Sequence, residues 1–138
     1  MLPRGYEHSG LTGAVIGCAM EVHSVLGAGF QEVVYQRALA SEMARAGIEF
    51  GREVEMTIMY KGLQVGVRRV DFLVGGVLTV EIKAVGQLEK AHWAQAMNYV
   101  EAYNVELGLL LNFGAGRLEF NRLVNNRYSP ALRPDNGR

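Results

Sequence analysis

The chain has a single cysteine and no net charge, and both shortages exclude classes of protein. With Cys18 alone, an intrachain disulfide and a multi-cysteine metal site are excluded, which is typical of a reducing compartment, so we expect a cytoplasmic protein. Lys and Arg number 14, as do Asp and Glu, so no excess positive field attracts nucleic acid or an anionic membrane. The apolar run from Leu11 is too short to predict a membrane span. Any binding of nucleic acid must rest on a local patch.

The chain does have enough hydrophobic sequence for one folded domain. Its 138 residues are 49% hydrophobic and 20% charged, which is the balance of a globular protein rather than a disordered one. We therefore expect a single domain over residues 1–138. The tail, residues 128–138, contains two prolines and little to bury, so we expect it to be mobile.

Hydrophobic periodicity predicts an α/β protein of mixed, α+β character with the order ααβββαββ. Ser9 is suited to cap a first helix that ends at the "GAG" of residues 27–29, and Gly47 stops a second helix that starts near Phe30. A third helix is predicted over residues 89–104. The predicted strands cover residues 52–60, 63–74, 77–85, 107–113 and 118–124. This order predicts a mixed sheet flanked by helices.

The hairpin around residues 75–76, two glycines, decides which side chains share a face of the sheet. A two-residue turn would mix charged and apolar residues on both faces. A three-residue loop, or one bulge, pairs Phe72 with Leu78 and Val70 with Val80, and it collects the apolar side chains on one face. We therefore predict an odd loop or a bulge.

The same register gathers charged residues on the opposite face, where Asp71, Thr79, Glu81 and Lys83 converge. Two carboxylates about 4 Å apart repel by roughly 4 kcal/mol at an effective dielectric of about 20. A divalent cation such as Mg²⁺ would resolve this conflict and activate a water, and Lys83 would stabilise the negative charge that develops. Such a face is suited to phosphodiester hydrolysis. The alternative is an Asp-Lys-Glu network on a solvated sheet face.

Two helical stretches add polar candidates. In "GFQEVVY", Glu32 and Tyr35 share one helical face, and in "HWAQAMNY" a polar stripe contains His92, Gln95 and Tyr99. Each has an ordinary alternative, which is a solvent-facing Glu, a surface Gln or a buried, satisfied Tyr. The predicted apolar stripe of the second stretch comprises Trp93, Ala96, Met97 and Val100.

In this order, "GFQEVVY", "RRVDFLV", "LTVEIKAV" and "QAMNY" resemble the GxxExxY proteins, a group within the PD-(D/E)xK nuclease-like superfamily. The resemblance extends over roughly residues 11–125 and implies a restriction-endonuclease-like fold. The motifs are short, and their joint order is more specific than any one of them. Val70 stands where the superfamily name has a proline.

The resemblance also implies a role for each matching position. Glu32 matches a helical acidic residue, Asp71 matches the first sheet aspartate, and Glu81 and Lys83 match the ExK element. The backbone carbonyl of Ile82 would complete the metal shell. Gln95 and Tyr99 match the QxxxY helix of a helicase-associated branch of these nucleases.

Our leading hypothesis is a metal-dependent nuclease that acts on nucleic acid, with DNA as the expected substrate. Glu32, Asp71 and Glu81 would hold Mg²⁺ or Mn²⁺, and Lys83 would assist the attacking water. The residues expected to position substrate are Gln95, Tyr99 and Tyr35, and a basic rim is expected from Arg52, Lys61, Arg68 and Arg69.

Two alternatives remain. One is a catalytically inactive binding or regulatory module in a larger nucleic-acid-processing assembly, and the other is a structural homo-oligomer whose charged face is an interface. Because the chain is small and neutral, we expect it to act with a protein partner or as a homo-oligomer, and not at a membrane.

Overall fold

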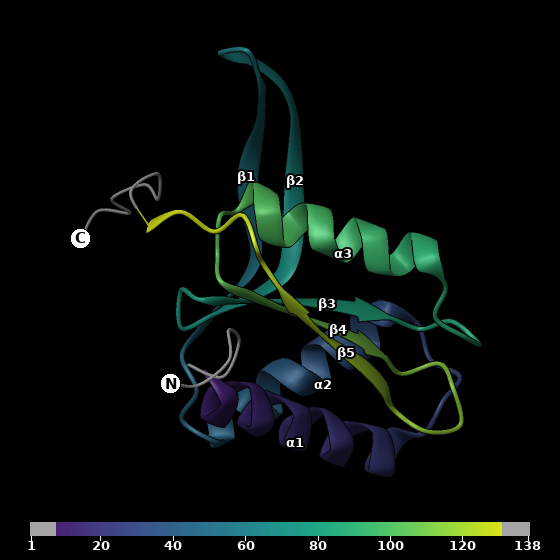
Figure 1. Ribbon diagram of the computed structural model, residues 1–138. Coiled ribbons are helices and arrows are strands. Elements are labelled where there is room, and N and C mark those ends of the chain that lie inside the picture. The colour runs from purple at the N-terminus through teal and green to yellow at the C-terminus, as the bar shows by residue number, and fades with distance from the viewer. Residues whose placement is uncertain (1–7, 131–138) are drawn as a thin grey trace.

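A computed structural model describes residues 8–130 and has the predicted order ααβββαββ (Figure 1). Two helices precede the strands along the chain, α1 (Ser9–Leu26) and α2 (Glu32–Arg45). A third helix, α3 (Lys90–Ala102), follows the third strand and precedes the fourth. The strands are β1 (Phe50–Tyr60), β2 (Leu63–Val74), β3 (Leu78–Lys83), β4 (Leu107–Asn112) and β5 (Glu119–Val124).

The five strands form one mixed sheet in the order β1-β2-β3-β4-β5. β3 and β4 are parallel and are connected through α3, whereas the other neighbours are antiparallel. β4 is buried along its whole length, as its unbroken apolar sequence predicts, and β5 is an edge strand. The sheet therefore separates α1 and α2 from α3 (Figure 1).

The hairpin between β2 and β3 has the predicted odd loop, which comprises residues 75–77. Its register pairs Val74 with Leu78 and Phe72 with Val80, so the expected pairing of Phe72 with Leu78 is wrong by two residues. A two-residue displacement leaves each side chain on its expected face. Gly75 and Gly76 both have positive φ angles, 58° and 72°, a conformation that glycine adopts without a steric cost.

Each face of the sheet buries its own group of apolar side chains. The larger group lies under α1 and α2 and includes Val15, Leu39, Phe72, Val80, Ile82 and Leu109. The smaller group lies under α3 and comprises Ala96, Val100, Val105, Leu110 and Leu123. The charged face predicted from sequence is therefore the face that α3 covers.

α1 differs from the sequence expectation in two respects. Its N-cap is His8, so Ser9 is the first helical residue and does not cap the helix. By length and composition the helix also meets the requirement for a membrane span, although the apolar run was expected to be too short. Core helices of soluble proteins meet the same requirement, and in this fold Val15, Ala19 and Val22 are buried in the larger core.

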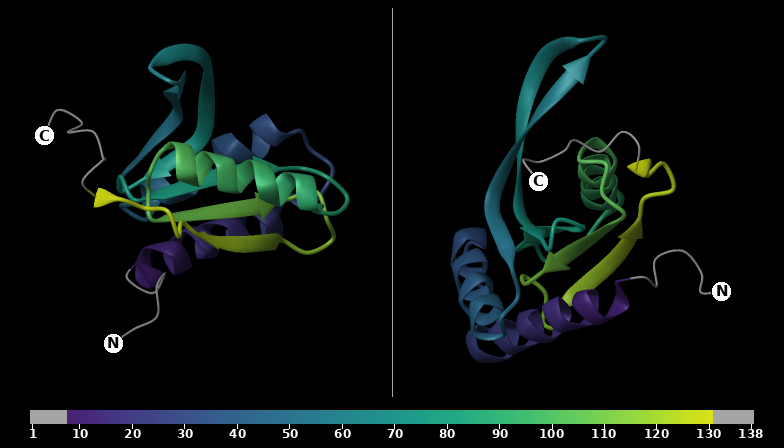
Figure 2. Two further views of the ribbon diagram at one scale, coloured as in Figure 1. Left: turned by 45° about the horizontal axis from the view of Figure 1, so that its top comes forward. Right: turned by 90° about the vertical axis from the view of Figure 1, so that its left-hand side faces the viewer.

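β1 and β2 continue past the sheet as a two-stranded ribbon (Figures 1 and 2). The two strands pair from Phe50 and Val74 out to Tyr60 and Leu63, but β2 pairs with β3 only over residues 72–74. We refer to the outer part of the ribbon, residues 57–67, as the arm.

The start of the predicted mobile tail is held by the rest of the fold. The side-chain amide of Asn104 donates to the carbonyl of Ser129 at 2.8 Å, and its oxygen accepts the N–H of Ser129 at 2.9 Å. These two bonds attach Ser129 to Asn104, just after the end of α3, and the mobility of residues 128–138 stays a prediction. Residues 131–138 lie outside the described residues.

Candidate functional site

Asp71 and Glu81 face each other where β2 leaves β3. The regular pairing of these strands ends at Phe72 and Val80, and beyond it the carboxylates accept the backbone hydrogen bonds. The N–H of Asp71 donates to Oε1 of Glu81 at 3.1 Å, and the N–H of Ile82 donates to Oδ2 of Asp71 at 2.7 Å. Because a buried N–H needs an acceptor, these reciprocal bonds hold both carboxylates in place. The predicted convergence of Asp71 and Glu81 is present.

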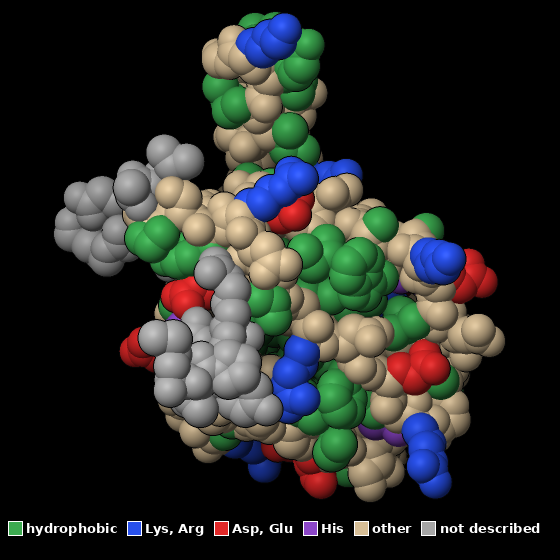
Figure 3. All heavy atoms as spheres, in the orientation of Figure 1, with side chains coloured by type: hydrophobic (Ala, Val, Ile, Leu, Met, Phe, Trp, Pro, Cys, Tyr) green, Lys and Arg blue, Asp and Glu red, His purple; other side chains and the backbone are tan. Residues whose placement is uncertain are grey.

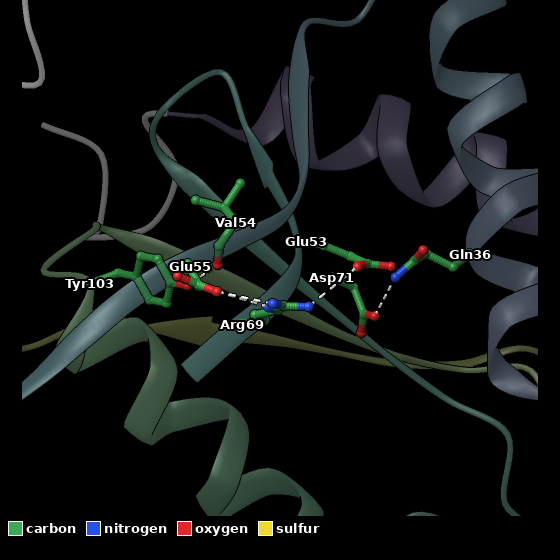
Figure 4. A network of polar contacts seen from close by, with 7 residues as sticks. All are labelled: Gln36, Glu53, Val54, Glu55, Arg69, Asp71 and Tyr103. Carbon is green, nitrogen blue, oxygen red and sulfur yellow. Dashed lines mark hydrogen bonds and ion pairs between the residues drawn. The ribbon is translucent and has the colours of Figure 1, made fainter. Parts of the chain in front are cut away.

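Gln36 contributes a third side chain to this pair, from α2. Its Nε2 donates to Oδ1 of Asp71 at 2.8 Å (Figure 4). The side chain is buried, with 6% of its surface exposed, and its Oε1 is buried without a hydrogen-bond partner. The sequence interpretation missed Gln36. It lies four residues after Glu32 and hence on the same helical face, which is the signal that could have identified it.

The electrostatics of the pair are unfavourable when both carboxylates are ionised. Burial raises the pKa of Glu81 to about 8, and the negative charge of Asp71 adds to the shift. The N–H of Asp71 and the positive charge of Lys83 lower this pKa but do not offset the rise. At neutral pH the protein alone therefore keeps a proton on Glu81, and a divalent cation would replace that proton.

Lys83 ends β3 on the same face, two residues after Glu81. Its Nζ donates to Oε1 of Gln95 on α3 at 3.1 Å. The structure thus brings together Lys83 and Gln95, which are residues of two separate motifs. The amide orients the ammonium group without neutralising its charge, and the charge of Lys83 acts on Glu81, whose pKa it lowers.

Tyr99 lies one helical turn after Gln95 and is buried. The guanidinium of Arg68 lies over its ring, 4.9 Å from the ring centroid, in a cation–π contact. The predicted apolar stripe of α3 is wrong at Trp93, which is 48% exposed. Ala96 and Val100 occupy the space under the helix instead.

Glu32 and Tyr35 do not join the carboxylate pair. Glu32 is exposed at the start of α2, and within residues 8–130 no hydrogen bond or ion pair connects it to Asp71 or Glu81. Tyr35 is fully buried, stacks on Phe113 with centroids 4.7 Å apart, and donates its hydroxyl to the carbonyl of Gly27. In this arrangement Tyr35 is enclosed in the core and presents no surface to a substrate, so its predicted contact with substrate stays a prediction.

The described part of the chain contains no cluster of three or more His, Cys, Asp or Glu side chains that could hold a metal ion. The donor set nevertheless fits a divalent cation. Two carboxylates lie together in a partly buried place, and Gln36 carries a buried oxygen that lacks a donor. Oxygen ligands of this kind are those that Mg²⁺ and Mn²⁺ prefer. The inclusion of Glu32 in the ligand set stays a prediction.

The predicted basic rim is dispersed. Arg69 is paired with Glu55 at 3.0 Å and lies 4.0 Å from Glu53 (Figure 4), whereas Lys61 lies on the arm. Figure 3 shows the basic side chains of one face scattered among apolar and acidic ones. No continuous positive track is apparent on this face, as the zero net charge leads one to expect.

Glu53 marks a strained point opposite the pair. Arg52 pairs with Phe72 and Val54 with Val70, so Glu53 stands across from Asp71 but is absent from the regular ladder. Its φ of 53° is in the left-handed region, which costs a residue with a side chain roughly 1 kcal/mol or more. The strained residue therefore lies on β1 at the level of Asp71.

Comparison with known proteins agrees with this geometry. The family model of the PD-(D/E)XK nuclease superfamily matches residues 9–123. Among curated proteins, none matches this chain. A solved structure described as "Crystal structure of SSO0001" is similar, with a TM-score of 0.55 and 19% identity, and the match covers 88% of this chain and 60% of that one. At this identity the likeness concerns the fold alone. The matched region contains both carboxylates, Lys83 and Gln95. The chain belongs to the PD-(D/E)XK nuclease superfamily.

Proposed function

We propose that the protein is a metal-dependent nuclease that hydrolyses phosphodiester bonds of DNA, and that it belongs to the GxxExxY group of its superfamily. The observation that carries the proposal is the placement of Asp71 and Glu81 in reciprocal hydrogen bonds, with Lys83 on the same face. Folding alone does not require two carboxylates to meet in a partly buried place, since the arrangement costs stability when both are charged.

Asp71 and Glu81 would hold Mg²⁺ or Mn²⁺, together with the carbonyl of Ile82. Rotation of the Gln36 amide would offer its unpartnered Oε1 to the same place, and Glu32, one helical turn away, remains a candidate ligand through water. When bound, the cation lowers the pKa of a coordinated water and offsets the charge of the phosphate. The protein's own contribution is to fix the two carboxylates in position through backbone hydrogen bonds, on the face of the sheet that α3 covers.

Lys83 and Gln95 would act on the phosphate. The ammonium group of Lys83 is a compact positive charge with three N–H donors. One of them donates to Gln95, so the others are able to donate to a phosphate. It would stabilise the negative charge that grows on the phosphate oxygens during attack. Gln95 keeps the ammonium in position, and its amide N–H groups are able to donate to substrate.

A second candidate function is a nucleic-acid-binding or regulatory module that retains the nuclease fold without turnover. The zero net charge and the pairing of Arg69 with Glu55 favour it, because a weak positive field gives weak binding of nucleic acid. Such a module would depend on a partner protein for its grip on nucleic acid.

The test is a cleavage assay with the purified protein, using labelled single- and double-stranded DNA and RNA in Mg²⁺, Mn²⁺ or chelator. The expected result is metal-dependent cleavage of DNA that is lost in Asp71→Asn. This change keeps the size of the side chain and removes its charge.

Glu101→Gln is a matched control, because it removes a carboxylate from α3 that is 4.0 Å from Arg127 and outside the site. It should cleave as the wild type does. If no substrate is cleaved while folded protein still binds nucleic acid, the second candidate replaces the first. If cleavage persists in Asp71→Asn, a contaminating nuclease or another site is responsible.

A further inference from the structure

The arm exposes many large apolar side chains to solvent. Five of its side chains are each 50% or more exposed: Met59, Tyr60, Leu63, Val65 and Val67. Among residues 8–130 no further strand pairs with the arm. The arm projects beyond the sheet in all views (Figures 1 and 2). A two-stranded ribbon without a packed face is marginal in water, and an apolar patch of this kind marks an interaction surface.

The charge of the arm limits the kind of partner. Lys61 at its tip is the one charged residue in residues 57–67, and Figure 3 shows apolar side chains below a basic tip. A ribbon that binds nucleic acid needs several Lys or Arg to contact phosphates. The arm therefore suits an apolar partner surface that carries negative charge at its edge.

The same chain has such a surface between α1 and α2. This α1–α2 groove has a volume of about 170 Å³ and an apolar lining that includes Val22, Val25 and Leu26, with Glu21 and Glu42 among its lining residues. Val25 is 70% exposed, so the groove offers apolar surface to a partner. Two carboxylates in the groove and one ammonium at the arm tip are complementary in charge.

The arm and the groove of one molecule are far apart, because the arm projects beyond the sheet on the side away from α1 and α2 (Figures 1 and 2). One molecule cannot insert its arm in its own groove. Two molecules related by a two-fold axis can insert both arms reciprocally, and such an exchange closes without forming a fibre. Zero net charge leaves the two copies without overall repulsion.

We propose that a second copy of this chain covers the arm. Tyr60 and Leu63 at the tip fill the α1–α2 groove of the partner subunit, and Lys61 lies against Glu21 and Glu42 of the partner subunit. The exchange buries apolar surface from both elements, which is the main driving force for association. The proposal is independent of the nuclease function, since the arm tip and the groove contain none of the residues of the candidate site.

The test is the molecular mass of the full chain in solution, measured by sedimentation over a range of concentrations. The expected result is a dimer whose dissociation constant rises about tenfold or more in Lys61→Glu, and in Leu63→Ser through loss of apolar contact. Lys90→Glu, a charge reversal on an exposed lysine at the start of α3, is the matched control and should leave the dimer intact.

A charge exchange makes the test specific to this pair of surfaces. A variant with Glu21→Lys and Glu42→Lys should also dissociate. Mixing it with Lys61→Glu should yield heterodimers, because opposite charges then meet in both arm–groove contacts, whereas like charges meet in both contacts of either variant's homodimer. A monomeric wild type overturns the proposal, as does a dimer insensitive to Lys61→Glu and Leu63→Ser. The proposal also fails if the arm variants instead weaken DNA binding by a monomer, because nucleic acid is then the occupant.

Discussion

Nε2 of Gln36 lies 2.8 Å from Oδ1 of Asp71, and this hydrogen bond joins α2 to the strand that carries the first carboxylate of the site. The other oxygen of Asp71 is held by the N–H of Ile82 on β3. Asp71 is thus positioned by two elements that are separate in sequence, α2 and β3.

Gln36→Met should reduce cleavage by about 10- to 100-fold, the usual cost of losing a side chain that orients a metal ligand. Methionine fills a similar volume but cannot donate to Asp71. The measurement is the cleavage rate at saturating and limiting Mn²⁺, with the larger loss expected at limiting metal. Gln31→Met serves as control, since Gln31 is exposed at the N-cap of α2 and makes no side-chain capping bond. Equal rates for the two variants would show that Gln36 does not orient Asp71.

The metal-free protein should lose stability as pH rises from about 4.5 to about 8. In this window the folded state keeps the proton of Glu81, whose pKa is raised to about 8 from the ordinary glutamate value of 4.5, whereas the unfolded state has lost it. The folded state then binds more protons, so the free energy of unfolding falls with pH, by at most about 1.4 kcal/mol per unit. Above pH 8 both states are ionised and this contribution no longer changes. Urea unfolding at several pH values measures it.

Glu81→Gln is the control for that profile, because an amide keeps an acceptor for the N–H of Asp71 without a charge. Its stability should match that of the wild type near the acid end of the window and exceed it at the alkaline end. Parallel profiles for the two proteins would mean that Glu81 does not titrate as inferred.

Binding of Mg²⁺ or Mn²⁺ at pH 7 should release about one proton per site, because Glu81 is mostly protonated below its pKa and a carboxylate ligand must be ionised. Titration calorimetry in two buffers of different protonation enthalpy gives the number directly. The release should decline at pH 9 and vanish in Glu81→Gln. Binding without release at pH 7 would place the cation elsewhere.

Lys83→Met should lower the maximal cleavage rate on the order of 100-fold, since it removes the positive charge that stabilises the transition state. The rise in melting temperature on adding Mn²⁺ should remain, because the carboxylates are intact. Lys90→Met, on an exposed lysine of α3, should change neither quantity. Loss of the metal response in Lys83→Met would instead give Lys83 a structural role.

Tyr35→Phe should lower the free energy of unfolding by about 1 kcal/mol and leave the cleavage rate of folded protein unchanged. The ring keeps its stack on Phe113, but the carbonyl of Gly27 loses its donor. Chemical unfolding and a cleavage assay on the same samples separate the two effects. A fall in activity without a fall in stability would restore the substrate contact first expected for Tyr35.

Much of the fold follows from patterns that are local in the sequence. Apolar periodicity is sufficient to predict the order ααβββαββ, because helices and strands bury one face at different spacings. Strand alternation is likewise sufficient to place Asp71, Glu81 and Lys83 on one face, since this depends only on whether the loop before Leu78 is odd or even. An error of two residues in register left that placement unchanged.

Tertiary structure alone decided the remainder. Where β2 separates from β3, the carboxylates of Asp71 and Glu81 accept hydrogen bonds from backbone N–H groups that would otherwise pair with the neighbouring strand. No local sequence pattern encodes the residue at which a strand leaves its sheet. The angle at which α2 crosses the sheet brings Gln36, rather than Glu32, to Asp71. Helical periodicity specifies which residues of α2 share the face that packs on the sheet, but not which of them contacts Asp71. That contact depends on how the helix packs over the whole core.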